Sequence, residues 1–459
     1  MRSSARVGAA GLALAAGTLA AAALAAGPAS ARPPDVAARS PVASPESAAG
    51  SSASLSRARL RSELRRLIRA AGSGAGAWVY DTRAKRTLFA RHASRRRVLA
   101  SNTKLFTTAA ALDRLGAGER LKTRVWATGL AVDEADPPAP GEPPAEEPPI
   151  EEPPSVPEDG VVEGSLYLVG DGDPALGSRS VARRRNVPLT SLKQLAADVK
   201  KAGVRRVKGK LRVDATVFDR RRGTGVSGWS RYIGPLSGLT YNAGAGGGDP
   251  SLAAGRAFQR ALRKRGVRVR AVARGRLPGR LRERPALATV RSPKLARLVD
   301  ETNETSNNFF AEMLLKRLAA GESRRGTTRG GARRARGFAR ELGAKVRTRD
   351  GSGLSRANRA SPRDVGRLLA EMLDHDASPA FEGSLPIAGR EGTVRHRMRG
   401  TAAQGRCRAK TGTLTGVSAL SGYCDAGGRK LVFSILINGV DVTAARSIQD
   451  LMTAAIARY

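Results

Sequence analysis

Apolar residues recur at helical spacing along much of this 459-residue chain. The clearest example lies at the end of the chain, where the spacing i, i+3, i+4, i+7, i+8 predicts a helix packed on a sheet. That stripe consists of Ile448, Leu451, Met452, Ala455 and Ile456. Further helices are predicted near the following positions: 60–68, 101–112, 189–203, 252–265, 292–301, 309–318, 329–340 and 364–373.

Runs rich in β-branched and aromatic residues, bounded by turn residues, predict strands between these helices. Such runs lie at 77–81, 87–90, 123–128, 164–169, 207–213, 267–273 and 430–437. A hairpin is predicted from Ala409 to Tyr423, with its turn centred between Thr415 and Gly416. This register sets Cys407 opposite Cys424, and we expect a disulfide between them if the chain is exported.

Breaks in the pattern divide the chain. Residues 1–31 combine two early arginines, an apolar run and an Ala-Ser-Ala end, which is typical of a cleaved secretory signal; an uncleaved membrane anchor is the alternative. Residues 32–55 resemble a flexible linker, and the Pro- and Glu-rich segment 133–160 resembles a disordered acidic loop. We expect 56–120 and 289–459 to form one domain and 121–288 to be an inserted α+β domain.

The net charge of +40 raises the question of a nucleic-acid partner. Aromatic residues make up only 4% of the chain, so a base-stacking surface is not expected, and the cations are spread along the sequence. Anionic polymers of a cell envelope are the partner that this charge favours in an exported protein. We expect no nucleic-acid partner.

The candidate chemistry begins at Ser101-Asn102-Thr103-Lys104, at the start of an apolar helix. Ser101 and Lys104 are three residues apart, so their side chains share a face, and a lysine of lowered pKa can take the proton of such a serine. A helix cap at Ser101 is the alternative interpretation. The chain has 3 histidines, and none lies in a Ser-His-Asp context, so the base of an acyl-transfer enzyme is expected to be lysine.

Two further motifs follow in order, Ser306-Asn307-Asn308 between two helices and Lys410-Thr411-Gly412 on a strand. Together the three motifs resemble those of the serine penicillin-recognising enzymes. The blocks Asp350-Gly351-Ser352-Gly353-Leu354-Ser355 and Ser384-Leu385-Pro386-Ile387-Ala388-Gly389 resemble one subgroup. This subgroup is the class C low-molecular-mass penicillin-binding proteins, the D-alanyl-D-alanine carboxypeptidase/endopeptidase family.

The resemblance implies a fold and a site. The fold is α/β (α+β), a transpeptidase-like domain with an antiparallel sheet flanked by helices, into which the smaller domain is inserted. Ser101 is then the nucleophile and Lys104 its base, kept partly neutral by the charge of Lys410. Ser306 relays a proton, and Asn308 orients Lys104 and the substrate. Lys410 and Thr411 bind the terminal carboxylate of the substrate, and Gly412 leaves room for the substrate along the strand. The N–H of Thr413 completes the oxyanion hole with that of Ser101.

The substrates implied are peptidoglycan stem peptides, with β-lactams as covalent inhibitors and no metal or other cofactor. The protein is then exported, and acts in the periplasm or at the cell wall. Two other functions remain open. A β-lactamase shares the acylation step, but Ser306 lies 202 positions after Lys104, which is more than a compact β-lactamase needs. A non-catalytic peptidoglycan- or polyanion-binding protein is disfavoured by the intact set of three motifs.

Overall fold

The computed structural model describes residues 56–130, 154–224, 232–245, 247–321 and 325–459. The predicted signal 1–31, the linker 32–55 and most of the acidic segment 133–160 lie outside these residues. Within the described part, no helix has the length and apolar character needed to cross a membrane. The same part contains no group of three or more His, Cys, Asp or Glu residues arranged to hold a metal ion.

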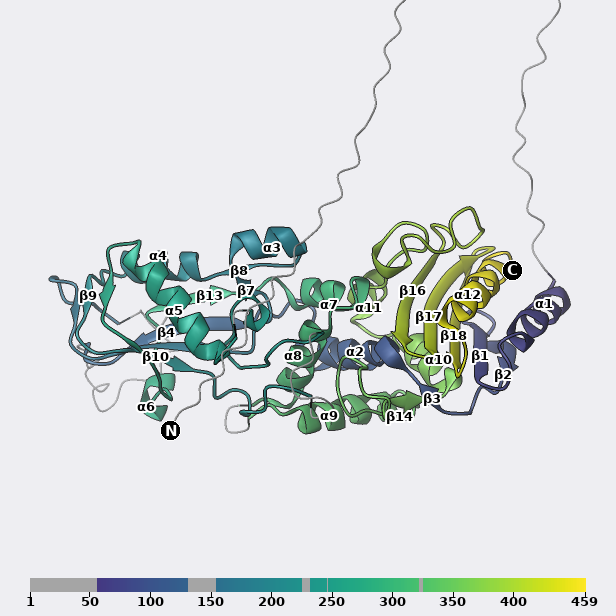
Figure 1. Ribbon diagram of the computed structural model, residues 1–459, viewed down its shortest axis with the longest axis horizontal. Helices are drawn as coiled ribbons and strands as arrows, with labels where there is room; N and C mark the ends of the chain where they lie inside the picture. The colour runs from purple at the N-terminus through teal and green to yellow at the C-terminus, as the bar shows by residue number, and fades with distance from the viewer. Residues whose placement is uncertain (1–55, 131–153, 225–231, 246, 322–324) are drawn as a thin grey trace, which may run out of the picture. The chain divides into compact units, whose positions relative to one another are not determined.

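The main sheet joins the two ends of the described chain. All four of its strand pairings are antiparallel, and β1 near the N-terminus pairs with β18 near the C-terminus (Figure 1). In sheet order the strands are β16 (Cys407–Leu414), β17 (Val417–Ala426), β18 (Arg429–Asn438), β1 (Ala75–Asp81) and β2 (Arg86–Arg91). The motif strand β16 is therefore an edge strand.

Helices cover both faces of this sheet, because alternate residues of β1 and β18 are apolar on each face. Val79 and Phe433 belong to one cluster with α1 (Arg57–Arg69) and α12 (Val442–Ala457). Trp78 and Leu436 belong to another, with α10 (Pro362–Glu371). The prediction for α12 is wrong at Leu451, which is 53% exposed, because the buried stripe runs through Ala445, Gln449 and Met452.

A bundle of helices carries the first two motifs. The helix α2 (Thr103–Leu115) follows the short 3-10 turn η1 (Ala100–Asn102), and all its residues from 103 to 112 are buried. It packs against α7 (Leu295–Glu304), α8 (Asn308–Ala319) and α9 (Thr328–Glu341). Beside the bundle lies a small antiparallel sheet of β14 (Val346–Arg347), β15 (Arg359–Ala360) and β3 (Arg97–Val98), and also α11 (Ser378–Gly383).

A second, mixed sheet uses strands from residues 122 to 291. In sheet order it contains β12 (Val272–Arg274), β10 (Leu211–Asp214), β6 (Leu166–Gly170), β4 (Lys122–Ala127) and β13 (Ala288–Arg291). It shares a core with α4 (Leu192–Lys201) and α5 (Pro250–Arg263). The strand predicted at 267–273 is instead two short pieces, β11 (Arg268–Val269) and β12. The domain boundaries at 121 and 288 remain predictions.

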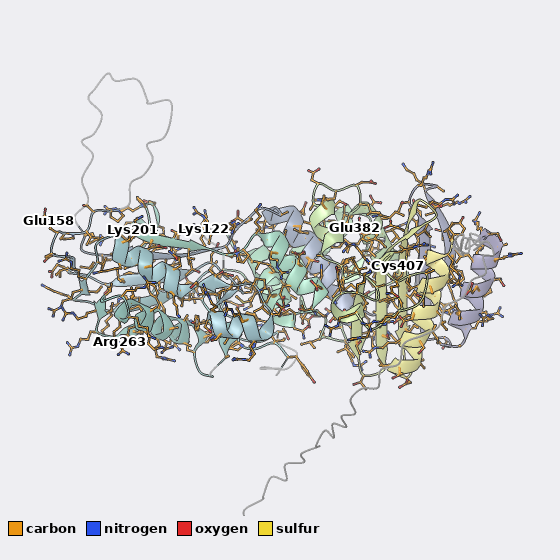
Figure 2. All side chains as sticks on the ribbon, turned by 90° about the horizontal axis from the view of Figure 1, so that it is seen from above. Lys122, Glu158, Lys201, Arg263, Glu382 and Cys407 are labelled. Carbon is orange, nitrogen blue, oxygen red and sulfur yellow. A yellow bond between two sulfur atoms is a disulfide. The ribbon has the colours of Figure 1, made fainter. Side chains whose placement is uncertain are left out.

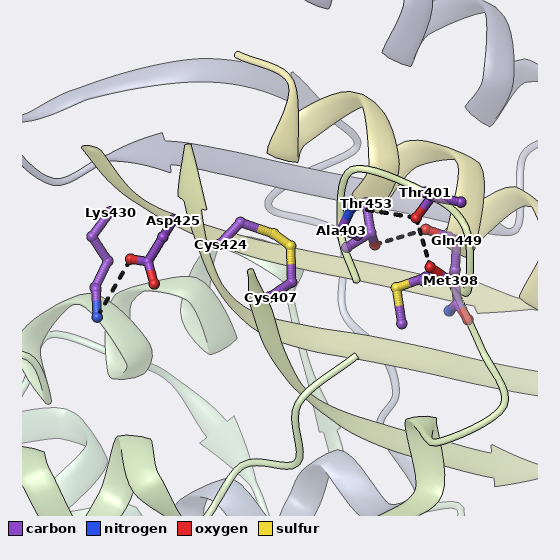
Figure 3. Close-up of a disulfide and its surroundings, with 9 residues drawn as sticks. All are labelled: Met398, Thr401, Ala403, Cys407, Cys424, Asp425, Lys430, Gln449 and Thr453. Atoms are coloured by element: carbon purple, nitrogen blue, oxygen red, sulfur yellow. Dashed lines mark hydrogen bonds and ion pairs between the residues drawn. A yellow bond between two sulfur atoms is a disulfide. The ribbon is translucent and has the colours of Figure 1, made fainter. Parts of the chain in front are cut away.

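The β16–β17 hairpin has the register that its turn predicts, with Leu414 opposite Val417 and Cys407 opposite Cys424. The two cysteines form a disulfide that links the far ends of the two strands (Figure 3). Cys407 is also labelled in Figure 2, where the side chains around the sheet are drawn. The disulfide lies at the end of the hairpin away from the turn, so it fixes the pairing over the whole length of β16.

Candidate active site

Ser101 lies in η1, which connects β3 of the small sheet to α2. The residue before it, Ala100, has a φ of 46°, which is uncommon for a residue with a side chain and marks a constrained backbone. Gly353 packs directly on it, since a Cβ on Gly353 would lie 1.9 Å from the Ala100 carbonyl oxygen. On the other side, Asn102 Nδ2 donates to the Lys410 carbonyl at 2.9 Å. The backbone of Ser101 is therefore held from two directions.

Lys104 lies one turn into the bundle and is fully buried. Its Nζ donates to three oxygens: Ser101 Oγ at 3.0 Å, Asn308 Oδ1 at 2.7 Å and the Ser352 carbonyl at 2.6 Å. The first two motifs thus meet at one nitrogen. An ammonium group has three N–H donors, so each has an acceptor here.

Burial lowers the pKa of Lys104 to about 7, because the ammonium form loses its hydration, while the nearby acids Glu312 and Asp350 raise the pKa. The expected cause was the charge of Lys410, and this is corrected: burial is the largest cause. Lys410 is itself buried, and both burial and the charge of Lys104 lower its pKa well below the usual value. The result is a lysine that is partly neutral near pH 7.

The second motif occupies the break between α7 and α8. Ser306 has a φ of 61°, so the chain turns sharply there, and Asn307 caps α8 by accepting from Phe310 N at 3.2 Å. Asn307 Nδ2 also donates to Glu301 Oε1 at 2.9 Å, which anchors the turn to α7. The Ser306 hydroxyl makes no hydrogen bond to another residue in the described part of the chain. Asn308 therefore reaches Lys104, whereas Ser306 itself does not.

The third motif passes beside Ser101 on β16. A Cβ on Gly412 would lie 2.7 Å from the Leu99 carbonyl oxygen and 3.0 Å from Ser101 N. We expected this glycine to make room for substrate, and the geometry gives it another role: it lets β16 approach the Ser101 backbone. Lys410 Nζ donates to the Thr411 carbonyl at 3.0 Å.

Sequence reasoning missed several polar groups at the site. Thr411 Oγ1 donates to Thr393 Oγ1 at 2.8 Å, and Arg446 Nη2 of α12 donates to Thr413 Oγ1 at 3.1 Å. Glu312 lies one turn after Asn308 and accepts from the loop that holds Ser352. The spacing of Asn308 and Glu312 on one helix was a usable signal, but nothing in the sequence marked Arg446.

The contacts of His375 are with residues outside the three motifs. Its Nε2 lies 3.3 Å from Asp113 Oδ1, and its ring packs edge-on against Phe338. The His375 side chain is partly exposed, 22% by area. The site geometry therefore rests on Lys104 as the titratable group next to the serine.

Comparisons with known proteins identify the family. The sequence profile of the D-Ala-D-Ala carboxypeptidase 3 (S13) family matches residues 58–136, 154–247 and 234–459. A D-alanyl-D-alanine carboxypeptidase of Actinomadura sp. strain R39 is 29% identical over 477 residues, covering 84% of this chain and 82% of that protein. A carboxypeptidase of Mycobacterium tuberculosis is 28% identical over 384 residues, covering 78% and 74%.

Among solved structures, penicillin-binding protein 4 of Haemophilus influenzae superposes with a TM-score of 0.66 at 20% sequence identity. The match covers 85% of this chain and 97% of that one, which confirms the predicted fold class. The family profile matches well over half of the chain. The protein therefore belongs to the D-Ala-D-Ala carboxypeptidase 3 (S13) family and is a serine peptidase.

Proposed function

We propose that this protein is a penicillin-sensitive D-alanyl-D-alanine carboxypeptidase or endopeptidase that acts on peptidoglycan stem peptides through an acyl-enzyme on Ser101. The observation that carries the proposal is the meeting of Ser101, Asn308 and the Ser352 carbonyl at the buried Lys104 amine. The names of the relatives support the substrate class, since D-alanyl-D-alanine carboxypeptidases are among them. One solved homologue is a complex of penicillin-binding protein 4 with a β-lactam.

Acylation begins with Lys104 neutral. Ser101 Oγ attacks the carbonyl carbon of the penultimate D-alanine while its proton passes to Lys104 Nζ. The C–N bond then breaks, and the leaving amine takes the proton that Lys104 accepted, passed on through Ser306, whose hydroxyl makes no hydrogen bond to another described residue. Water later hydrolyses the ester and frees Ser101. The backbone N–H groups of Ser101 and Thr413 are proposed to bind the oxyanion, and the close approach of β16 to Ser101 N supports this.

The terminal carboxylate of the substrate is proposed to bind at Lys410, Thr411 and Thr413. Lys410 is buried and its pKa is lowered, so an arriving carboxylate favours its charged form again. Arg446 supplies a second cation next to Thr413 Oγ1, on the exposed side of the strand. The substrate carboxylate would therefore lie near one buried cation, Lys410, and one exposed cation, Arg446.

Intact mass spectrometry after incubation with benzylpenicillin tests this function. We expect one stable covalent adduct on the wild-type protein and none on S101A. A matched S56A variant alters an exposed serine that caps α1, and it should keep the adduct. A wild-type protein without an adduct contradicts the proposal. Rapid loss of the adduct with release of hydrolysed penicillin identifies a β-lactamase instead.

The place of action that we propose is the cell envelope, where the substrate is found. The charge of the chain further suggests an anionic polymer of that envelope as a partner. A cleft of about 710 Å³ between the second sheet and the end of α8 supports this partner. Its cations are Lys122 (labelled in Figure 2), Arg124, Arg276, Arg282, Arg317 and Arg325.

Most of these cations are not neutralised. Arg317 pairs with Asp171 at 3.3 Å and Arg282 with Asp214 at 2.9 Å. The other four have no carboxylate within ion-pair distance among the described residues. Arg124 stacks over Trp126 at 5.7 Å, and burial and neighbouring arginines lower its pKa despite the opposing charge of Asp171. Crowded cations of this kind are stabilised by phosphate or carboxylate groups.

A further inference from the structure

Glu312 is a buried carboxylate next to the site that none of the roles above uses. It lies on α8 one turn after Asn308, so the two side chains share a face of the helix. The residue is 0% exposed. A carboxylate so deeply buried is costly unless it has hydrogen-bond donors or a counter-charge. Its partners therefore indicate what it does.

Those partners are backbone donors of the loop after β14. Glu312 Oε1 accepts from Gly351 N at 2.9 Å and from Ser352 N at 2.7 Å. The carbonyl of the same Ser352 accepts from Lys104 Nζ at 2.6 Å. Ser352 is thus held through its N–H by Glu312, while its carbonyl holds the amine of Lys104. The loop is also fixed to α2, because Thr107 Oγ1 donates to the Gly351 carbonyl at 3.0 Å.

Three other charged groups lie near Glu312 and Lys104. The charge of Lys104 lowers the pKa of Lys410 on β16, and Asp350 and Glu312 raise the pKa of Lys104. The Asp350 carboxylate is engaged within its own loop, where it accepts from Gly353 N at 2.8 Å and Ser355 N at 2.7 Å. Lys316, one turn further along α8, is engaged by Asp219 at 2.6 Å. Glu312 is therefore the acid held directly against the Lys104 support.

We propose, on the basis of the function proposed above, that Glu312 is a positioning residue for acylation. It holds the Ser352 carbonyl in place as an acceptor for Lys104, and its carboxylate supplies the negative charge that the Lys104 ammonium needs after it has taken the Ser101 proton. In that step the Ser101 O–H bond breaks and an N–H bond forms on Lys104. A Ser101 Oγ–C bond forms as the π bond of the substrate carbonyl opens, and its electron pair moves to the carbonyl oxygen, which becomes the oxyanion. The cluster gains one positive charge near the buried carboxylate.

The titration of Glu312 supports this role. Burial raises its pKa to about 7, and the charge of Asp350 acts in the same direction, while the loop N–H donors lower it. Glu312 and Lys104 therefore change protonation in the same pH range, and the charge of Glu312 raises the pKa of Lys104. Removing the carboxylate charge should leave a Lys104 that is neutral at lower pH but is a weaker base.

The test is the pH dependence of nitrocefin acylation in E312Q, followed by stopped-flow absorbance with intact mass spectrometry. Glutamine keeps an oxygen that can accept from Gly351 N and Ser352 N, so the loop support is retained while the charge is lost. We expect the acid limb of the second-order acylation rate to move by about one unit toward lower pH, and the plateau to fall about tenfold or more, since a weaker base transfers the proton less well. E312D keeps the charge and should return the acid limb to the wild-type position with a lower plateau.

Matched controls separate this role from general instability. E341Q removes an exposed glutamate at the end of α9 and should leave the pH profile unchanged. Thermal melting of each variant reports folding, and E312D carries the test if E312Q does not fold. An E312Q profile that superimposes on the wild type, or an E312D limb shifted as in E312Q, contradicts the role of Glu312. A wild-type protein that is not acylated at all contradicts the proposed function instead.

Discussion

The amine of Lys104 has three hydrogen-bond partners, which differ in whether they can donate as well as accept. The Asn308 amide oxygen and the Ser352 carbonyl can only accept, whereas the Ser101 hydroxyl can donate or accept. A neutral amine has two N–H groups and one lone pair. If its two N–H groups are bound by Asn308 and Ser352, the lone pair points at the Ser101 proton. The neighbours thus orient the base as well as lowering its pKa.

The first prediction concerns pH. The neutral amine is the form that accepts a proton, and its fraction rises as the pH increases through the pKa of Lys104, about 7. The second-order rate of acylation by benzylpenicillin should therefore rise with pH, with an apparent pKa near that value, and K104M should reduce the rate by about a hundredfold or more. Rapid-quench mass spectrometry measures both. A rate that falls with rising pH over this range would contradict lysine as the base.

The elements of the fold meet at Ser101 through close backbone approach. β16 lies against η1, and the bond from Asn102 Nδ2 to the Lys410 carbonyl joins the first motif to the third. The strained turns at Ala100 and Ser306 bring side chains from two helices to the same point. The approach of β16 to Ser101 N requires the absence of a side chain at Gly412, and the packing against the Ala100 carbonyl requires its absence at Gly353.

The second prediction is that G412A impairs acylation. Its Cβ would overlap the Leu99 carbonyl oxygen and crowd Ser101 N, and both are backbone atoms with little freedom to move. A displacement of β16 should lower the acylation rate by about tenfold or more, since small misplacements at a reacting centre cost that much. G337A is the control, because a Cβ there meets no atom within 4 Å and a helical alanine is favoured. Equal rates for G412A and the wild type would refute the role of close approach.

Across the molecule, one helix connects the active site with the second sheet region. α8 carries Asn308, Glu312 and Lys316 at intervals of four residues, so all three lie along one face. Asn308 contacts Lys104, while Lys316 Nζ bonds Asp219 at 2.6 Å and the Arg221 carbonyl at 2.7 Å. The region between the first two motifs is thus tied to the same helix that positions the base.

The basic cleft leads to a prediction about binding. A polyphosphate chain should bind the wild-type protein with an affinity that falls steeply with salt, and K122Q/R276Q should lower the slope of log affinity against log salt by about one to two. R65Q/R69Q removes the same charge from the exposed face of α1 and is the control. Fluorescence anisotropy measures both slopes. An equal loss in the two double variants would show that the attraction is general rather than located at the cleft.

Much of the fold was predictable because local patterns and tertiary packing agree. The strands of the main sheet, the helices α1, α2, α5, α8 and α9, and the hairpin register follow from periodicity and turn residues. The errors have a common cause. Leu451 fits a helical stripe but faces away from the sheet, and the run at 267–273 alternates like a strand but finds neighbours only for short pieces. Whether a residue is buried depends on which neighbouring element its side of the helix or strand packs against. Periodicity alone does not give that information.

The candidate site divides in the same way. The three motifs, their order, their family and the pairing of Cys407 with Cys424 could be predicted, because these depend on residue type, spacing and one local turn. The tertiary structure alone decided that burial, rather than Lys410, lowers the pKa of Lys104. It also decided that Gly412 serves close backbone approach and that Glu312 holds Ser352. Desolvation and contact distance belong to groups brought together from distant parts of the chain, and they exist only in the folded molecule.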